Sequence, residues 1–166
     1  MMNEMFEKFK KPNKYIAVDE TMVPFRERVS FRQYIPCQWH KYGIKLFKVC
    51  DTDAYTHRVE IYQGKYITKG ENLTKLVLRL CEGYLNKERT IVTDNFYTGI
   101  ELARELLDKN THLIGTLRKY RKGLPKEVTS TKLKTGEIVG RGGSKLYSNF
   151  EMEGLAQWAK YLSYTR

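Results

Sequence analysis

Residues 89–99 read Arg-Thr-Ile-Val-Thr-Asp-Asn-Phe-Tyr-Thr-Gly: a charged turn, a short β-branched run, and an aspartate followed by a turn sequence. This pattern predicts a buried strand that presents Asp94 at its C-terminal end, where open α/β sheets carry their sites. Residues 15–20, Tyr-Ile-Ala-Val-Asp-Glu, have the same design and present Asp19. Each aspartate alone is better explained as a turn residue or a helix N-cap. Together they predict two carboxylates at one edge of a sheet.

A carboxylate pair of this kind is suited to divalent metal ions. Hard, oxygen-seeking cations such as Mg²⁺ and Mn²⁺ are bound by Asp and Glu rather than by His and Cys. Two carboxylates on adjacent strand ends can hold two ions roughly 3.5–4 Å apart, the arrangement used in phosphoryl-transfer enzymes. Such sites usually need a third acid, which we expect on a helix after the fifth strand.

The charge of the chain favours a polyanionic partner. Thirty basic residues against nineteen acidic residues leave a net charge of +11 over 166 residues, a length that fits one ordinary domain. Such a field attracts nucleic acid first and an acidic membrane surface second. The alternative is that the charge serves only solubility.

The cysteines and histidines exclude several other classes of protein. The three cysteines and three histidines are widely spaced and include no Cys-x-x-Cys pair, which argues against a disulfide framework and a zinc module. The chain contains no apolar run of 18 residues and begins without an apolar signal core. We therefore expect a soluble, intracellular protein without a membrane partner.

The hydrophobic periodicity predicts an ordered series of elements. Residues 1–14 form a basic lead-in with a short helix, and helix 99–109 is expected to bury Ile100, Ala103, Leu106 and Leu107. The strands are predicted at 15–19, 43–50, 56–62, 89–94 and 112–117, with a further helix at 72–86. Three antiparallel strands followed by alternating helices and strands are typical of a ribonuclease H-like α/β mixed sheet, in which the first and fourth strands carry acids.

Two further segments have alternative interpretations. Residues 20–36 alternate arginines with aromatic residues, a combination suited either to phosphate contacts and base stacking or to a loop that packs its aromatics on the domain. Asp51 and Asp53 lack the glycine and terminal glutamate of a calcium loop, so we interpret residues 51–54 as a hairpin turn.

Five blocks in a constant order resemble the piggyBac transposase family, from about residue 15 to residue 140. They are Val18–Phe25 (Val-Asp-Glu-Thr-Met-Val-Pro-Phe), Tyr42–Leu46 (Tyr-Gly-Ile-Lys-Leu), Tyr62–Lys65 (Tyr-Gln-Gly-Lys), Thr93–Thr98 (Thr-Asp-Asn-Phe-Tyr-Thr) and Gly115–Pro125 (Gly-Thr-Leu-Arg-Lys-Tyr-Arg-Lys-Gly-Leu-Pro). Each block is weakly diagnostic alone, whereas the series is specific. The resemblance implies a ribonuclease H-like catalytic core of a DDE/D DNA transposase, acting at transposon ends or on duplex DNA.

The resemblance also implies roles for individual residues. Asp19 and Asp94 match the family's first two catalytic acids and would bind Mg²⁺ or Mn²⁺ in a two-metal site. A DNA substrate implies residence in the nucleus. The basic residues that we expect to contact DNA are Arg26, Arg28, Arg32, Lys45, Arg118, Lys119, Arg121 and Lys122.

Departures from the family pattern argue against full activity. Glu27 replaces a glycine, and Lys160, in Gln157–Lys160, stands where the third acid is expected. The acids after residue 136 are Glu137, Glu151 and Glu153, and none lies in that context. We divide the chain into the lead-in 1–14, a core 15–140 and a divergent tail 141–166.

Several functional alternatives therefore stay open. The N-terminal DNA-binding and dimerisation region and the cysteine-rich zinc domain of the family are missing, so we expect a truncated copy whose homodimer would form through the missing regions. The alternatives are a non-catalytic DNA-binding or interaction protein that retains the fold and a translation product without selected function.

Overall fold

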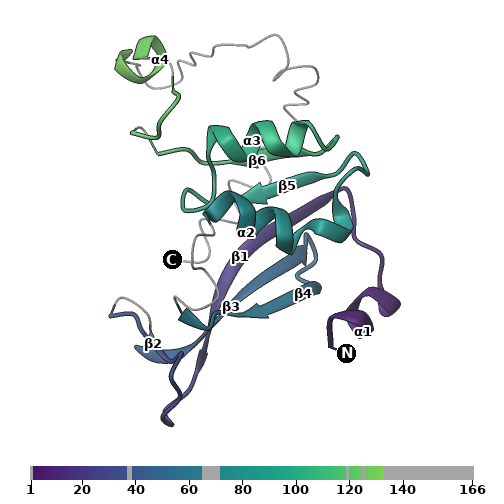
Figure 1. The fold of residues 1–166 in the computed structure, drawn as a ribbon, viewed down its shortest axis with the longest axis vertical. Coiled ribbons are helices and arrows are strands. Elements are labelled where there is room, and N and C mark those ends of the chain that lie inside the picture. The colour runs from purple at the N-terminus through teal and green to yellow at the C-terminus, as the bar shows by residue number, and fades with distance from the viewer. Residues whose placement is uncertain (1, 37–38, 65–71, 119, 125, 133–166) are drawn as a thin grey trace. The chain divides into compact units, whose positions relative to one another are not determined.

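The computed structural model describes residues 2–36, 39–64, 72–118, 120–124 and 126–132 (Figure 1). The chain divides into two compact units, residues 1–124 and 125–166, and the described part of the second unit holds the helix α4 (Lys126–Ser130). The helices of the first unit are α1 (Met2–Phe9), α2 (Leu73–Leu80), the 3₁₀ helix η2 (Glu82–Tyr84) and α3 (Ile100–Leu107). Its strands are β1 (Tyr15–Pro24), β2 (Gln33–Tyr34), β3 (Tyr42–Asp51), β4 (Thr56–Ile61), β5 (Thr90–Thr93) and β6 (His112–Gly115).

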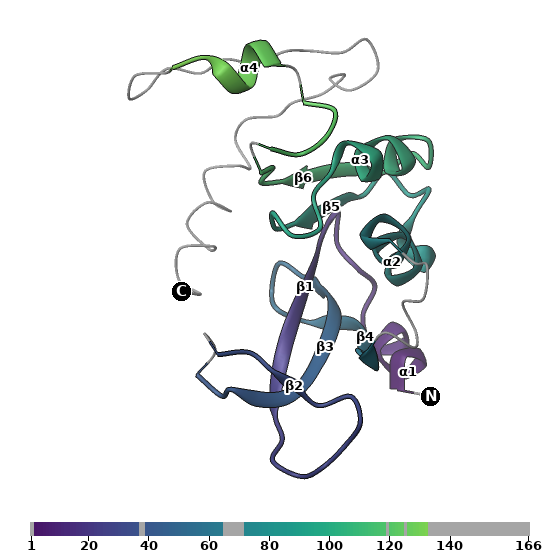
Figure 2. The ribbon, with the colours of Figure 1, turned by 60° about the vertical axis from the view of Figure 1, so that its left-hand side comes forward.

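The strands form one mixed sheet (Figure 2). Its order is β2-β3-β1-β5-β6, and β4 pairs with β3. The pairs β1–β3, β2–β3 and β3–β4 are antiparallel, whereas β1–β5 and β5–β6 are parallel. The structure confirms the predicted ribonuclease H-like α/β architecture, with three antiparallel strands and then alternating helices and strands.

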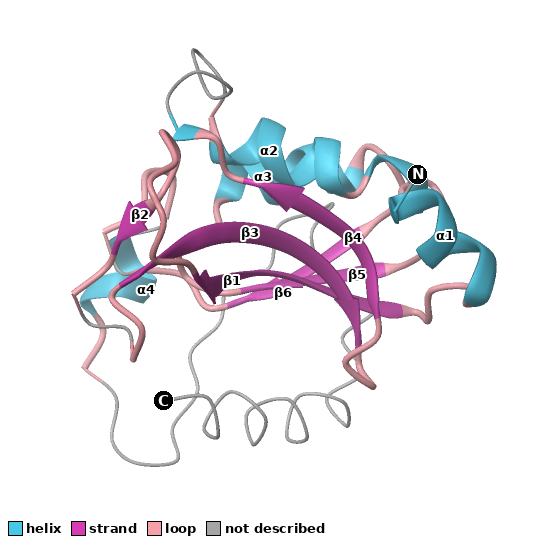
Figure 3. Cartoon of the chain, turned by 90° about the horizontal axis from the view of Figure 1, so that it is seen from below, coloured by secondary structure: helices cyan, strands magenta, loops and turns pink. Residues whose placement is uncertain are grey.

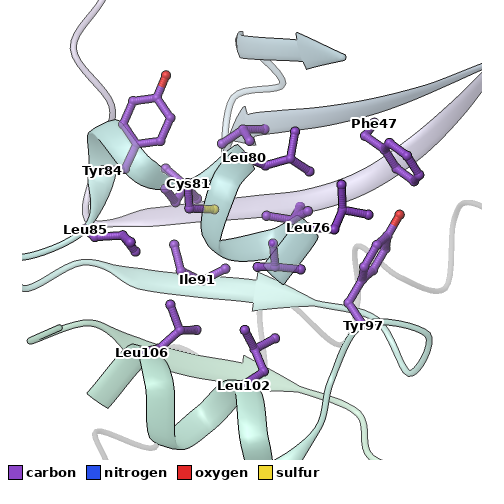
Figure 4. Close-up of a cluster of buried hydrophobic side chains, with 14 residues drawn as sticks. Phe47, Leu76, Leu80, Cys81, Tyr84, Leu85, Ile91, Tyr97, Leu102 and Leu106 are labelled. Atoms are coloured by element: carbon purple, nitrogen blue, oxygen red, sulfur yellow. The ribbon is translucent and has the colours of Figure 1, made fainter. Parts of the chain in front are cut away.

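The main core lies between one face of the sheet and the helices α2 and α3, which share that side of the sheet (Figure 3). Alternation along β1 buries Ile16 and Val18, and the neighbouring strands add Val49 and Ile91 to the same layer. In the view of Figure 4, the labelled leucines of α2 lie higher than Ile91 and those of α3 lie lower. Tyr84 lies at one end of the cluster and Tyr97 at the other. The core fixes β1 and β5 side by side.

Helix α2 confirms the predicted apolar stripe, with one change. Asn72 caps its N-terminus by accepting a hydrogen bond from the Lys75 N–H at 2.9 Å. The predicted single helix 72–86 ends at Cys81 and continues as the separate turn η2, which carries the buried Tyr84. None of the described helices has the length and apolar character needed to cross a membrane.

The predicted buried face of the second helix was wrong in part. Helix α3 buries Leu102 and Leu106, whereas Ile100, Ala103 and Leu107 are only half-buried. Leu102 and Leu106 are four residues apart and therefore lie on the same side of the helix. The sequence pattern allows two overlapping stripes in this helix, and packing on the sheet selects the one that contains Leu102.

The first strand is longer than predicted. β1 continues to Pro24 because residues 20–24 pair with β3, ending at the pair Pro24 and Gly43. A side chain at position 43 has no room, since a Cβ atom there would lie 2.4 Å from the carbonyl oxygen of Val23. Residues 20–24 therefore belong to the sheet rather than to the irregular segment predicted from the sequence.

Candidate active site

Asp19 and Asp94 lie where the parallel pairing of β1 with β5 ends. Val18 and Thr93 are the last paired residues of β1 and β5, and each aspartate follows directly. Both strands run in the same direction, so the two aspartates are neighbours at the carboxyl end of β5, beside which β1 continues to Pro24. The structure thus brings together the two acids that the sequence predicted as neighbours.

Backbone hydrogen bonds orient both carboxyl groups. The Asp94 Oδ1 atom accepts the Phe96 N–H at 2.9 Å and the Tyr97 N–H at 3.4 Å. The Asp19 Oδ1 atom accepts the Glu20 N–H at 2.8 Å. Within the described residues, the Oδ2 atom of each group accepts no hydrogen bond. Asp94 therefore acts as a turn residue and still has one oxygen available for a ligand.

The surroundings of Asp19 disfavour its charge. Partial burial of the carboxyl group is the main cause of its raised pKa, and the negative charges of Glu20 and Asp94 raise the pKa further. The Glu20 N–H and the positive charge of Lys48 act in the opposite direction. The negative charge of Asp94 is therefore one of the causes that disfavour the charged form of Asp19.

The two aspartates have the donor chemistry of a divalent-cation site but an incomplete ligand set. Among the described residues, no basic side chain forms an ion pair with either of them. In the same part of the chain, no group of three or more Asp, Glu, His or Cys side chains gathers around a common point. Further ligands would have to come from water, a substrate or the rest of the chain.

The turn after β5 is held tightly against β6. The Thr98 hydroxyl donates to the Asp94 carbonyl oxygen at 2.6 Å, and it lies 2.7 Å from the Thr93 hydroxyl. Gly115 on β6 pairs with Thr93, and a Cβ atom at Gly115 would lie 2.2 Å from the Thr98 Oγ1 atom. The glycine therefore permits the close packing that supports the Asp94 turn.

Two contacts near the acids were not predicted from the sequence. The Tyr97 hydroxyl donates to the Glu20 Oε2 atom at 2.5 Å, and the Lys45 Nζ atom lies 3.6 Å from the Glu20 Oε1 atom. Glu20 and Tyr97 belong to the same two motifs as the aspartates. That proximity in sequence was the available signal, but their mutual contact depends on the pairing of distant strands.

The predicted DNA-binding residues fall into two groups. Some make internal contacts: the Arg118 Nε–H donates to Asn95 Oδ1 at 3.1 Å, and the Arg121 Nη2–H donates to the Phe96 carbonyl at 2.6 Å. Arg32 donates to the Arg26 carbonyl at 2.7 Å and lies 4.9 Å from the centre of the Tyr42 ring.

The remaining predicted contacts have different positions. Arg26, Arg28 and Lys122 are exposed, whereas Lys45 is largely covered beside Glu20. Lys119 lies outside the described residues, as do Lys160, Glu137, Glu151 and Glu153, which concern the third acid. Contact of these basic residues with DNA stays a prediction.

Comparison with known proteins gives two matches. The family model described as Transposase IS4 matches residues 1–156. The chain is also similar in structure to a piggyBac transposase in a synaptic complex with hairpin DNA, solved by cryo-electron microscopy. The TM-score is 0.68 at 29% sequence identity, over 75% of this chain and 27% of that transposase. This chain thus spans about a quarter of the length of the relative. The chain belongs to the Transposase IS4 family and carries a piggyBac-type transposase domain with a ribonuclease H-like fold.

Proposed function

We propose that this chain is the metal-binding part of a DDE/D-type DNA transposase catalytic centre, with Asp19 and Asp94 as ligands for Mg²⁺ or Mn²⁺. The observation that carries the proposal is the position of the two carboxylates directly after the last paired residues of two adjacent parallel strands. Among the described residues neither carboxylate has an ion-pair partner, so both stay available to a ligand, and Lys48 on the neighbouring strand β3 offsets the charge of Asp19 only in part.

The protein contributes position and charge to the proposed reaction. Backbone N–H groups orient the Asp94 carboxylate without a ligand. Partial burial and the negative charges of Glu20 and Asp94 disfavour the charged form of Asp19, so a bound cation would stabilise that form. A divalent ion bound there would supply the acidity that activates water or a 3′-hydroxyl for attack on a DNA phosphodiester.

The presence or absence of a third acidic ligand distinguishes a catalytic domain from a non-catalytic one. Lys160 stands at the position expected for that acid, and within the described residues no third carboxylate joins Asp19 and Asp94. This observation favours a second candidate, a non-catalytic DNA-binding domain that retains the fold. We propose DNA as the partner in both cases and the nucleus as the location.

Calorimetric titration with Mn²⁺ tests the proposed metal site. The wild-type chain should bind Mn²⁺, and Asp19→Asn and Asp94→Asn should each weaken the affinity at least tenfold because each removes a charged ligand. Asp108→Asn removes an exposed aspartate after α3 and serves as the matched control. Equal affinities in the wild type and both site variants would refute the metal site.

DNA binding and cleavage require separate measurements. Fluorescence anisotropy with duplex DNA should show binding that weakens steeply with salt, because basic residues displace counterions from the phosphates. Replacing the exposed pair Arg28 and Lys122 by alanine should weaken binding at low salt and lower the salt slope by up to about two. Mn²⁺-dependent nicking of the duplex would support the catalytic candidate, whereas binding without nicking would support the second candidate.

A further inference from the structure

We propose that Tyr97, Glu20 and Lys45 form a latch of positioning residues, which holds the Asp94 turn against β1 and thereby sets how the carboxylates of Asp19 and Asp94 face a common metal ion. The proposal rests on the proposed function. It adds Tyr97 and Glu20, which touch neither the metal nor DNA but determine the affinity of the site for the metal.

The latch joins two segments that are far apart in the chain. Glu20 follows Asp19 directly, Tyr97 lies three residues after Asp94, and 77 positions separate the two. The Tyr97 hydroxyl donates to Glu20 at 2.5 Å, and the Lys45 ammonium lies 3.6 Å from the other oxygen of the same carboxylate. Each carboxylate oxygen of Glu20 therefore has one partner, and the two partners come from different elements.

The latch is anchored in the core rather than on the surface. Tyr97 is 2% exposed, and its ring makes edge contacts with Phe47 and Phe96 at 6.5 and 5.0 Å between centroids. Figure 4 shows Tyr97 beside Phe47 at one end of the hydrophobic cluster. The Lys45 Nζ atom lies 5.2 Å from the ring centres of Phe47 and Phe96. Because close packing leaves a buried ring few rotamers, the Tyr97 hydroxyl has a fixed place, and its bond to Glu20 fixes the Asp94 turn relative to β1.

Tyr97 also contacts Asp94 itself. Its backbone N–H donates to the Asp94 Oδ1 atom, while its side chain reaches Glu20. Burial raises the pKa of the Tyr97 hydroxyl, and the bond to Glu20 raises it further, so the hydroxyl stays protonated and remains a donor. Successive side chains of β1 point to opposite faces of the sheet. Tyr97 and Lys45 therefore contact Glu20 on the core face, while Asp19 lies on the other face.

The molecule contains a matched control at the other end of the same core. The Tyr84 hydroxyl donates to the Glu7 Oε1 atom at 3.3 Å and is 3% exposed. Burial raises the pKa of Tyr84 to about 12, so this hydroxyl is also a protonated donor. Tyr84→Phe therefore removes a buried tyrosine–glutamate bond without touching the strand ends that carry Asp19 and Asp94.

The test is Mn²⁺ titration of the 166-residue chain, with Tyr97→Phe compared with Tyr84→Phe. We expect Tyr97→Phe to weaken Mn²⁺ affinity about tenfold, as is typical when the support of a metal ligand is lost, and Tyr84→Phe to change it less than twofold. Glu20→Gln keeps an acceptor for Tyr97 and should stay within about threefold of the wild type, whereas Glu20→Ala should match Tyr97→Phe. The double variant Tyr97→Phe/Glu20→Ala should lose no more than either single variant.

A second readout makes the latch testable without metal. Amide hydrogen exchange by NMR should be faster at Phe96 and Tyr97 in Tyr97→Phe than in the wild type and Tyr84→Phe, because those amides hold Asp94. If the wild type binds no Mn²⁺ but this local acceleration occurs, the metal site fails while the latch stands as a positioning contact. If Mn²⁺ binds and Tyr97→Phe changes neither the affinity nor the local exchange more than Tyr84→Phe does, the latch is refuted.

Discussion

Two regions of β1 have carboxylates in opposite circumstances, one region at the start of the strand and one in its middle. At its start, Ile16 pairs with Asp51 of β3, which is 4% exposed. The Asp51 Oδ2 atom lies 2.9 Å from the His57 Nε2 atom and 3.3 Å from the Lys10 Nζ atom. Its Oδ1 atom accepts the Asn13 N–H at 3.0 Å.

In the middle of β1, the negative charge of Asp94 disfavours the charged form of Asp19, and among the described residues neither carboxylate has an ion-pair partner. A buried carboxylate persists only if other groups compensate its charge, and Asp51 has such groups. Asp19 and Asp94 have no ion-pair partner among the described residues, and Lys48 offsets the charge of Asp19 only in part. The difference separates a carboxylate that supports the fold from a pair that is available to a ligand.

The largest predicted effect tests the supporting role of Asp51. Asp51→Asn should lower the free energy of unfolding by about 3–5 kcal/mol, because it removes one partner of a buried, charge-compensated cluster. Urea unfolding followed by circular dichroism measures this loss. Asp53→Asn is the control, since Asp53 is an exposed aspartate that also pairs with Lys10. Equal free energies of unfolding for Asp51→Asn and Asp53→Asn would contradict the supporting role of Asp51.

An intermediate effect is expected in the turn that follows β5 and holds Asp94. Gly115→Ala should lower the free energy of unfolding by about 1–3 kcal/mol, because the new Cβ atom would lie 2.6 Å from the Thr93 carbonyl oxygen and still closer to Thr98. The same urea experiment applies. Gly99→Ala introduces a Cβ atom with nothing within 4 Å and should have little effect. Equal free energies of unfolding for Gly115→Ala and Gly99→Ala would show that the Asp94 turn can move to accommodate the added methyl group.

The smallest effect has the opposite sign and concerns Asp19. Its raised pKa means that the folded state disfavours the charged form, so the ionised group lowers stability at neutral pH. Asp19→Asn should therefore raise the metal-free stability at pH 7, by less than about 1 kcal/mol because solvent screens the exposed group.

Thermal unfolding at a series of pH values measures this difference. The gain should be largest above the folded-state pKa of Asp19 and should disappear below its ordinary value of 3.8, where wild-type Asp19 is protonated in both folded and unfolded states. A variant less stable than the wild type at pH 7 would show that Asp19 supports the fold, as Asp51 does.

Much of the fold could be predicted from the sequence because its signals are local. The alternating residues of β1, the β-branched run of β5 and the apolar stripe of α2 each lie within a few residues, and each appears in the structure. The order of these elements was enough to predict the ribonuclease H-like sheet. The position of Asp19 and Asp94 at adjacent strand ends followed from that order, since parallel strands end at the same edge.

Other features depended on tertiary contacts. The predicted hairpin turn at residues 51–54 connects β3 and β4, but the sequence did not indicate that Asp51 is buried beside His57 of β4 and Lys10, which follows α1. The choice of Leu102 for the core and the contact between Tyr97 and Glu20 have the same origin, because both require elements that the chain brings together only when the sheet forms.

The sequence by itself thus determined which elements form and which acids end the strands, because periodicity and turn chemistry act over short distances. Only the tertiary structure decided that Asp51 is buried among polar partners and that Asp19 and Asp94 have no ion-pair partner among the described residues. That outcome depends on strand pairing and core packing, which bring Asn13 to Asp51 from 38 positions away and Tyr97 to Glu20 from 77 positions away.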